Sequence, residues 1–179
     1  MTNLFFIDYE TNGLNPYHNE IIEVGIRKMG VDDYYSSLVK PNAVNGIHFK
    51  YVPEKITKIT GIRDIDIEKN GINPMIASHA TIKYIIEKSD EGPIYILAHN
   101  GLQFDFIFFR KMIKLYSESE EIMTRSKSID SLIERFVYID TVMLGRLLLP
   151  NESVSQPTLC KKFNVKNEKE HRAMGDVNS

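Results

Sequence analysis

The fold of this chain is decided by residues 4–14, which read LFFIDYETNGL. The apolar run, followed by an Asn-Gly pair, predicts a central strand that is covered on both faces and ends in a turn. Side chains alternate along a strand, so Asp8 and Glu10 project from one face with backbones about 6 to 7 Å apart. Two carboxylates this close to a core need compensation, and oxygen ligands favour a hard divalent cation. An acid pair at a strand end is also common on solvated surfaces, so the other acids decide between these readings.

The composition is that of a single globular domain. The chain has 179 residues, of which 42% are hydrophobic and 26% are charged, and we expect residues 1–179 to form one domain. With 22 Lys and Arg against 24 Asp and Glu, the net charge is -2, which excludes a nucleic-acid binder that relies on overall positive charge. Cys160 is the only cysteine, so an internal disulfide and a cysteine-rich zinc site are both excluded.

The ends and the apolar segments give no sign of a membrane protein. No secretory signal is recognisable at the start, and no segment approaches the roughly 18 apolar residues of a membrane span. We therefore expect a cytoplasmic or nuclear protein that binds no membrane. The sequence leaves the oligomeric state open, and a homodimer is one of the options.

The remaining elements predict an α/β fold. Strands are expected at residues 21–27, 34–40, 94–98 and 135–139, and helices at about 74–90, 102–116, 141–149 and 158–163. The first three strands read as an antiparallel meander, and the helix before residue 94 implies a crossover to a parallel strand. Residues 52–71 read as a loop with one helical turn, and residues 117–131 as a loop.

Acidic residues follow other strands as well as the first. Asp105 comes shortly after the strand at 94–98, and Asp176 lies near the end of the sequence. The carboxyl ends of strands in such a sheet share one edge, where sites usually form. Taken singly, each of these acids also fits a first-turn helix position, and His171 alone fits an exposed histidine.

The order of these residues is more informative than any one of them. Asp8-x-Glu10, then His99-Asn-Gly-x-x-Phe-Asp105, then His171 five residues before Asp176 resembles the three motifs of the DEDDh family of 3'-to-5' exonucleases. This family includes bacterial proofreading subunits, oligoribonuclease and the three-prime repair exonucleases. The resemblance covers nearly the whole chain and implies a ribonuclease H-like fold, with a five-stranded mixed sheet flanked by helices. The expected last helix, around Asp176, would be cut short by the end of the sequence.

The resemblance also implies roles for individual residues. Asp8, Glu10 and Asp176 would hold one Mg²⁺, Asp8 would bridge to a second, and Asp105 would support that second ion, with Mn²⁺ able to substitute. His171 would be the general base, because imidazole titrates near neutrality. The positions implied to contact the terminal nucleotide are Thr11, Asn12, Gly13 and Leu14. His99 and Asn100 would contact substrate or simply cap the following helix.

Basic residues on the expected helices have two readings. They either hold the backbone of a nucleic-acid strand or form ordinary solvated helix faces. The residues concerned are Lys111, Lys114, Lys161, Lys162 and Lys166.

The expected activity is release of nucleoside 5'-monophosphates from the 3' end of a nucleic acid. The run from His99 to Asp105 is one residue longer than in the usual proofreading subunits and looks like that of the three-prime repair exonucleases, which favours single-stranded DNA. An exoribonuclease of the same family is the nearest alternative. A catalytically silent nucleic-acid-binding or polymerase-associated module, and a structural domain with incidental acids, are the others.

Overall fold

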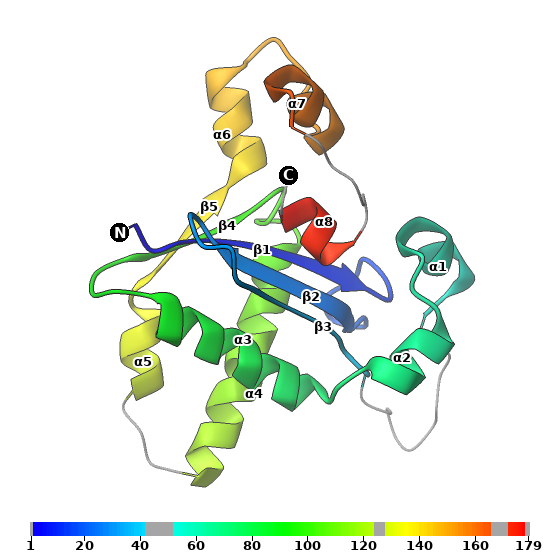
Figure 1. Ribbon diagram of the computed structural model, residues 1–179, viewed down its shortest axis with the longest axis vertical. Helices are drawn as coiled ribbons and strands as arrows, with labels where there is room; N and C mark the ends of the chain where they lie inside the picture. Colours follow the sequence, from blue (N-terminus) through cyan, green and yellow to red (C-terminus); the bar gives the residue numbers. More distant parts are fainter. Residues whose placement is uncertain (1, 42–51, 124–127, 166–171, 178–179) are drawn as a thin grey trace.

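A five-stranded mixed sheet forms the centre of the protein, as predicted (Figure 1). The computed structural model describes residues 2–41, 52–123, 128–165 and 172–177. The strands are β1 Leu4–Thr11, β2 Ile21–Lys28, β3 Tyr34–Leu38, β4 Ile94–Ala98 and β5 Phe136–Asp140. They are arranged in the order β3-β2-β1-β4-β5, so β1 is the central strand. The first three strands are antiparallel, whereas β4 pairs in parallel with both β1 and β5.

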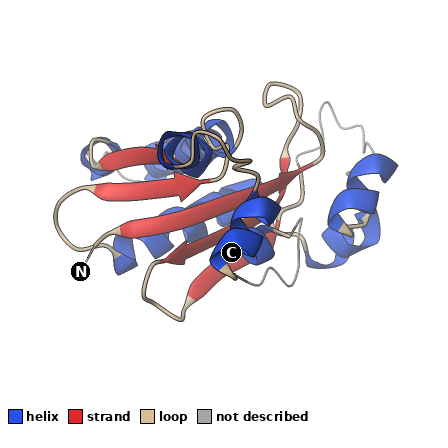
Figure 2. Ribbon diagram, turned by 90° about the horizontal axis from the view of Figure 1, so that it is seen from above, coloured by secondary structure: helices blue, strands red, loops and turns tan. Residues whose placement is uncertain are grey.

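Helices flank both faces of this sheet (Figure 2). They are α1 Glu54–Thr60, α2 Asp64–Asn70, α3 Pro74–Lys88, α4 Asp105–Met123, α5 Ser128–Ile133, α6 Thr141–Leu148, α7 Gln156–Phe163 and α8 Ala173–Val177. The helices α6 and α7 extend away from the sheet beyond α8 (Figure 1). Among the described residues, no helix combines the length and the apolar composition needed to cross a membrane.

The main hydrophobic core lies between the sheet and the helices α3 and α4. Phe5, Ile7 and Tyr9 alternate along β1 and are buried in one cluster with side chains of both helices, such as Ile82 and Phe108. The residues between them, Asp8 and Glu10, therefore project from the opposite face of the sheet. A deeply buried strand thus presents its carboxylates on the face where α8 packs.

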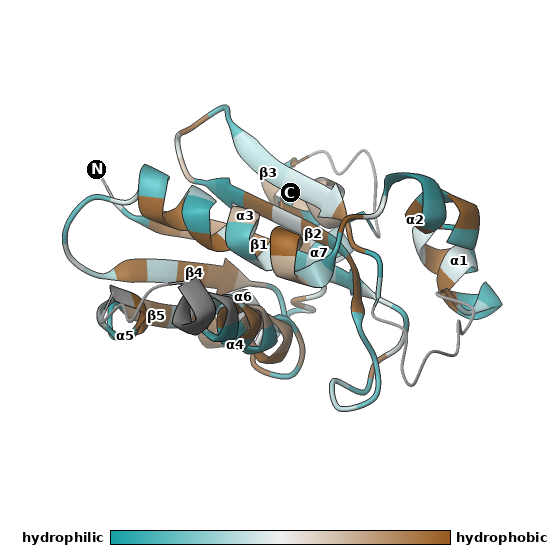
Figure 3. Ribbon diagram, turned by 90° about the horizontal axis from the view of Figure 1, so that it is seen from below, coloured by the Kyte–Doolittle hydropathy of each residue, from teal (hydrophilic) through white to brown (hydrophobic). Residues whose placement is uncertain are grey.

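The helix α3 shows how the local sequence sets an element that covers this core. Pro74 occupies its first turn, and the Asn73 side chain accepts a hydrogen bond from the Met75 N–H, so the helix is capped where the sequence predicts its start. Hydrophobic and hydrophilic residues alternate along α3 (Figure 3). Its buried positions include Ala77 and Ile85, which face the main core.

Two regions predicted as loops are helical instead. Residues 52–71 contain α1 and α2, which enclose a small second core of Ile22, Val52, Ile62 and Ile67. Gly61 ends α1 in a left-handed conformation, with a φ of 73°, and so permits two short helices in succession.

The prediction of a loop at residues 117–131 is also wrong for the described residues 117–123 and 128–131. The helix α4 continues to Met123, and α5 begins at Ser128. A polar sequence does not exclude a helix, because polar side chains can pair along its surface; Lys114, for example, pairs with Glu118 one turn later.

Candidate active site

The candidate site is built on three carboxylates from opposite ends of the chain. Asp8 and Glu10 come from the last half of β1, and Asp176 comes from α8. One carboxylate oxygen from each residue lies within 4.8 Å of the others. The gathering that the motif order implied for these three acids is therefore present in the fold.

Two residues of β2 set the position of α8 on the sheet. Gly25 pairs with Asp8 and Glu23 pairs with Glu10, so all four lie on the same face. A Cβ atom on Gly25 would lie 2.8 Å from the backbone carbonyl carbon of Ala173. Only a residue without a side chain lets α8 approach the sheet this closely beside Asp8.

The start of α8 is tied to the sheet by a half-buried ion pair. The Arg172 guanidinium donates to both carboxylate oxygens of Glu23, at 2.6 Å from Nη2 and 3.0 Å from Nε. The backbone N–H of Ala173 donates to Glu23 as well, at 3.0 Å. Because Glu23 is only 4% exposed, its charge needs these partners. The same contacts fix the helix that carries Asp176.

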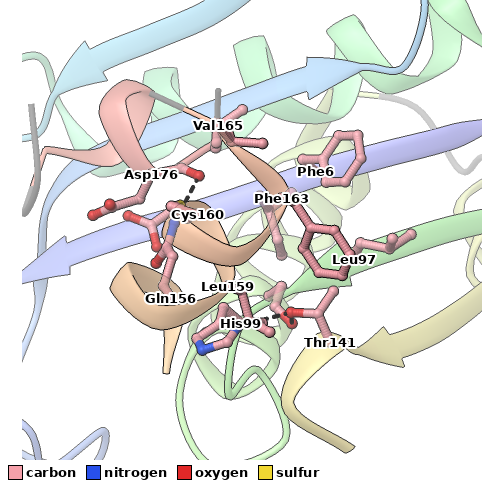
Figure 4. A pocket seen from close by; sticks show the side chains of 14 residues that line it. Phe6, Leu97, His99, Thr141, Gln156, Leu159, Cys160, Phe163, Val165 and Asp176 are labelled. Atoms are coloured by element: carbon pink, nitrogen blue, oxygen red, sulfur yellow. Dashed lines mark hydrogen bonds between the residues drawn. The ribbon is translucent and has the colours of Figure 1, made fainter. Parts of the chain in front are cut away.

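A contact from α7 holds the other side of α8. The Gln156 side-chain amide donates to the backbone carbonyl of Asp176 at 3.1 Å (Figure 4). Gln156 also lines the cleft above the three carboxylates. The short helix α8 is thus held by side chains from β2 and from α7.

The fourth predicted acid, Asp105, lies in the same cleft but outside the group of three. It is the first residue of α4 and is 3% exposed. Its Oδ1 accepts the Tyr9 backbone N–H at 3.1 Å, which joins α4 to β1 beside Asp8. Asp105 lines the cleft together with Asp8, Glu10 and Asp176, a position that suits support of a second ion.

Without a cation, burial and mutual repulsion make the ionised forms of these carboxyl groups unfavourable. Burial raises the pKa of Asp8 well above its ordinary value, and the charges of Asp105 and Glu10 raise it further. Burial, followed by the charges of Asp176 and Glu23, raises the pKa of Glu10 to about 8. Burial also raises the pKa of Asp105 to about 7, although the Tyr9 N–H opposes this shift. Clustered oxygen ligands with these properties fit a hard divalent cation.

This arrangement predicts a pH-dependent stability of the metal-free protein. The pKa of Glu10 is about 8 in the folded protein against an ordinary value of 4.5. A carboxyl with a raised pKa stabilises the fold below its ordinary pKa, and this contribution is lost as the pH rises through the folded value. We expect the unfolding free energy in EDTA to fall between about pH 4.5 and 8, measured by urea denaturation. Mg²⁺ should restore it at pH 8; equal stability with and without Mg²⁺ would contradict this.

The loop after β1 forms one wall of the cleft. The Thr11 hydroxyl donates to the Gly13 carbonyl at 2.6 Å, and the Asn12 side chain accepts the Glu20 N–H at 2.8 Å. Both side chains thus stabilise the loop itself. Leu14 lines the cleft, yet it is 79% exposed. An apolar side chain left open at the rim offers a surface for a flat ring, and the cleft, about 420 Å³, has room for one nucleotide.

The turn at residues 99–102 forms the opposite wall. His99 Nδ1 lies 3.0 Å from the Thr141 hydroxyl (Figure 4), and burial lowers the pKa of His99. Asn100 adopts a left-handed conformation with a φ of 63°, and the Asp140 carboxylate accepts the N–H groups of Asn100 and Leu102. His99 and Asn100 therefore shape the turn and also line the cleft.

Three of the predicted basic residues form contacts within the protein, and a fourth is exposed. The Lys111 ammonium donates to the Asn19 carbonyl at 3.1 Å and so holds the loop that carries Leu14. Lys162 forms an ion pair with Glu152 at 2.7 Å. Lys114 pairs along its own helix, and Lys161 is exposed. His171 and Lys166 lie outside the described residues.

The ion pair of Glu23 and Arg172 leads to a stability prediction. Replacing Glu23 with glutamine leaves the Arg172 charge without its partner, and the Arg172 side chain is 41% exposed. We expect the unfolding free energy to fall by about 1 to 3 kcal/mol, less than for a fully buried pair. Glu54→Gln breaks an exposed pair with Lys58 and should cost under about 0.5 kcal/mol. Equal losses in the two variants, by urea denaturation, would contradict a special role for Glu23.

Sequence reasoning assigned no site role to Glu23 or Gln156. The signal for Glu23 was present, because a single acid within the apolar strand IIEVGI needs a buried partner. Gln156 gives no such signal, since a polar residue at a helix start is ordinary. Its contact with Asp176 depends on how α7 packs.

The chain matches a known protein family over nearly its whole length. Residues 5–179 match the family RNase_T, described as exonuclease. The chain is 30% identical over 175 residues to the PolC-type DNA polymerase III of Thermotoga maritima, covering 96% of this chain and 11% of that protein. It is 27% identical over 176 residues to the same type of polymerase from Bacillus subtilis, covering 95% and 10%. The chain thus spans only a small part of these relatives.

Solved structures share the fold. Escherichia coli exonuclease I in complex with a dT13 oligonucleotide superimposes with a TM-score of 0.71 at 20% identity, covering 99% of this chain and 39% of that chain. The complex with a dA16 oligonucleotide gives a TM-score of 0.70 and the same identity, covering 99% and 38%. The predicted ribonuclease H-like fold is confirmed. The particular likeness to the three-prime repair exonucleases stays a prediction.

Proposed function

Because this chain belongs to the RNase_T exonuclease family, we propose that it is a metal-dependent 3'-to-5' exonuclease that acts on single-stranded DNA. Residues 1–179 would act as one exonuclease domain that releases nucleoside 5'-monophosphates. The observation that carries the proposal is the group of Asp8, Glu10 and Asp176, with oxygens within 4.8 Å of one another. An open cleft with the exposed Leu14 at its rim adjoins this group.

The carboxylates fit two Mg²⁺ ions. Asp8, Glu10 and Asp176 would hold one, and Asp8 together with Asp105 would hold the other, with Mn²⁺ as a substitute. When bound, such ions neutralise the negative charge that develops on the phosphate and on its flanking oxygens during hydrolysis. The raised pKa values of Asp8 and Glu10 support this, because a cation removes the repulsion that raises them.

The protein's own residues would position the strand and move the proton. Leu14 would pack on the last base, and the backbone of Gly13 would approach the terminal nucleotide. His171 would accept the proton of the attacking water as general base. In the sequence it directly precedes Arg172, whose ion pair with Glu23 fixes the start of α8.

We propose DNA as the substrate because of the names of the similar proteins and the contents of the similar structures. The relatives at 30% and 27% identity are DNA polymerases by name, and the similar exonuclease I structures contain DNA oligonucleotides. The complete set of acids argues against a catalytically silent module, since clustered carboxylates without ions repel each other and a nucleic acid alike.

Incubation with labelled oligonucleotides tests the proposal. Matched single-stranded DNA and RNA carrying a 5' label are incubated with Mg²⁺, with Mn²⁺ and with EDTA. We expect a ladder shortened from the 3' end on DNA with either metal, and none with EDTA. Full-length DNA that survives both metals would overturn the proposal, and preferential shortening of RNA would replace DNA with RNA as the substrate.

A further inference from the structure

No lysine or arginine is among the described residues that line the cleft itself. Among the described residues that line the cleft and the two hollows adjoining it, Arg146 is the only lysine or arginine. A strand is held largely through its phosphates, and arginine binds phosphate with several parallel donors. Among the described lining residues, Arg146 is therefore the one best suited to contact a backbone phosphate.

Arg146 lines a hollow that continues from the cleft. This hollow, about 710 Å³, lies between α6 and the loop that leads to α7, and it shares His99 and Asn100 with the cleft. Its other polar lining includes Ser153 and Ser155. A strand whose last nucleotide occupies the cleft can thus pass over the turn at residues 99–102 into the hollow.

The surroundings leave Arg146 available for a ligand. The acid that shares the hollow, Glu152, is paired with Lys162 at 2.7 and 2.8 Å. The nearby Asp140 accepts backbone N–H groups, including that of Val142 at 2.8 Å. Arg146 is exposed, and it has no ion pair within the parts of the chain that the structure describes.

The wall that carries Arg146 is closely packed at one point. A Cβ atom on Gly145 would lie 3.1 Å from a methyl group of Val154. The helix α6 therefore approaches the opposite wall of the hollow without an intervening side chain. This contact sets the width of the hollow beside Arg146.

We propose that this hollow binds a backbone phosphate of the strand that remains after cleavage. Arg146 supplies the positive charge. The side-chain amide of Asn100 and the hydroxyls of Ser153 and Ser155 supply neutral donors. The inference rests on the proposed function and adds to it a contact beyond the scissile phosphate. It assigns to Arg146 a role in holding strands of more than two nucleotides.

Substrate length tests the subsite. A dinucleotide with a free 5' hydroxyl has only the scissile phosphate, whereas a tetranucleotide has two more. Arg146→Ala should lower kcat/KM on the tetranucleotide about tenfold and leave that on the dinucleotide unchanged. Replacing the upstream phosphates in turn with neutral methylphosphonates should cost the parent protein the same factor at one position, and cost the variant nothing there.

A matched control and the ionic-strength dependence complete the test. Lys69→Ala removes an exposed charge on α2, which contributes no described residue to the lining of these hollows, and it should not change the ratio between the two substrates. Arg146→Ala should also lower the slope of log KM against log salt by about 1. Equal losses on both substrates, or none on either, would overturn the subsite. A parent protein that cleaves neither substrate would overturn the proposed function, and the subsite with it.

Discussion

Replacing Asp8 with asparagine is expected to reduce kcat/KM at least about a thousandfold, or about 4 kcal/mol of transition-state stabilisation. Asp8 belongs to the group of three carboxylates, and it lies in the same cleft as Asp105. The amide keeps the size of the side chain but removes the charge that both proposed ions need. The measurement is initial rates on single-stranded DNA at saturating Mg²⁺.

The same variant separates catalysis from folding. Because burial raises the pKa of Asp8 well above its ordinary value, a neutral amide removes a buried charge, and the metal-free protein should be at least as stable as the parent at pH 8. Asp32→Asn is the matched control, since its side chain is fully exposed, and it should keep the parent rate. Comparable turnover in Asp8→Asn would refute the role given to Asp8.

Replacing His171 with alanine is expected to reduce kcat about a hundredfold to ten-thousandfold, the usual range for the loss of a general base. Metal binding should change little, because the proposed ligands come from β1, α4 and α8 rather than from His171. The pH profile should change as well, since the limb that reports ionisation of an imidazole should disappear. Rates from pH 5 to 9 and a calorimetric Mn²⁺ titration measure these effects.

A histidine elsewhere controls for general effects on the fold. His79 lies on α3, where its ring packs against Tyr116. His79→Ala should keep both the rate and the pH profile of the parent. An unchanged profile in His171→Ala, or a loss of Mn²⁺ binding in that variant, would exclude His171 as a base that acts apart from the ions.

The elements nearest the site were the most predictable from the sequence. The strand at 94–98 has the predicted bounds, and β1 occupies the predicted central place. Both are apolar runs bounded by turn residues. Such runs predict central strands well, because a strand that is buried on both faces must be apolar along most of its length. The grouping of Asp8, Glu10 and Asp176 followed from the order of motifs, which no single motif would have indicated.

The rest depends on contacts between distant residues. The helices α1 and α2 are short, and their stability comes from packing around Ile62 and Ile67 rather than from a strong periodic pattern. Likewise, the position of α8 on the sheet depends on Gly25 and on Glu23, which lies 149 residues from Arg172 in the sequence. Local propensity gives no information about such partners, so the anchoring of Asp176 was visible only in the fold.

We propose that the clustered carboxylates of the cleft hold a pair of divalent ions. A crystal of the protein grown with Mn²⁺ and a nucleoside 5'-monophosphate tests this proposal most directly. We predict two anomalous-scattering peaks about 3.5 to 4 Å apart. One should lie among Asp8, Glu10 and Asp176, and the other between Asp8 and Asp105. Peaks only elsewhere on the protein, with none beside Asp8 at saturating Mn²⁺, would contradict the account.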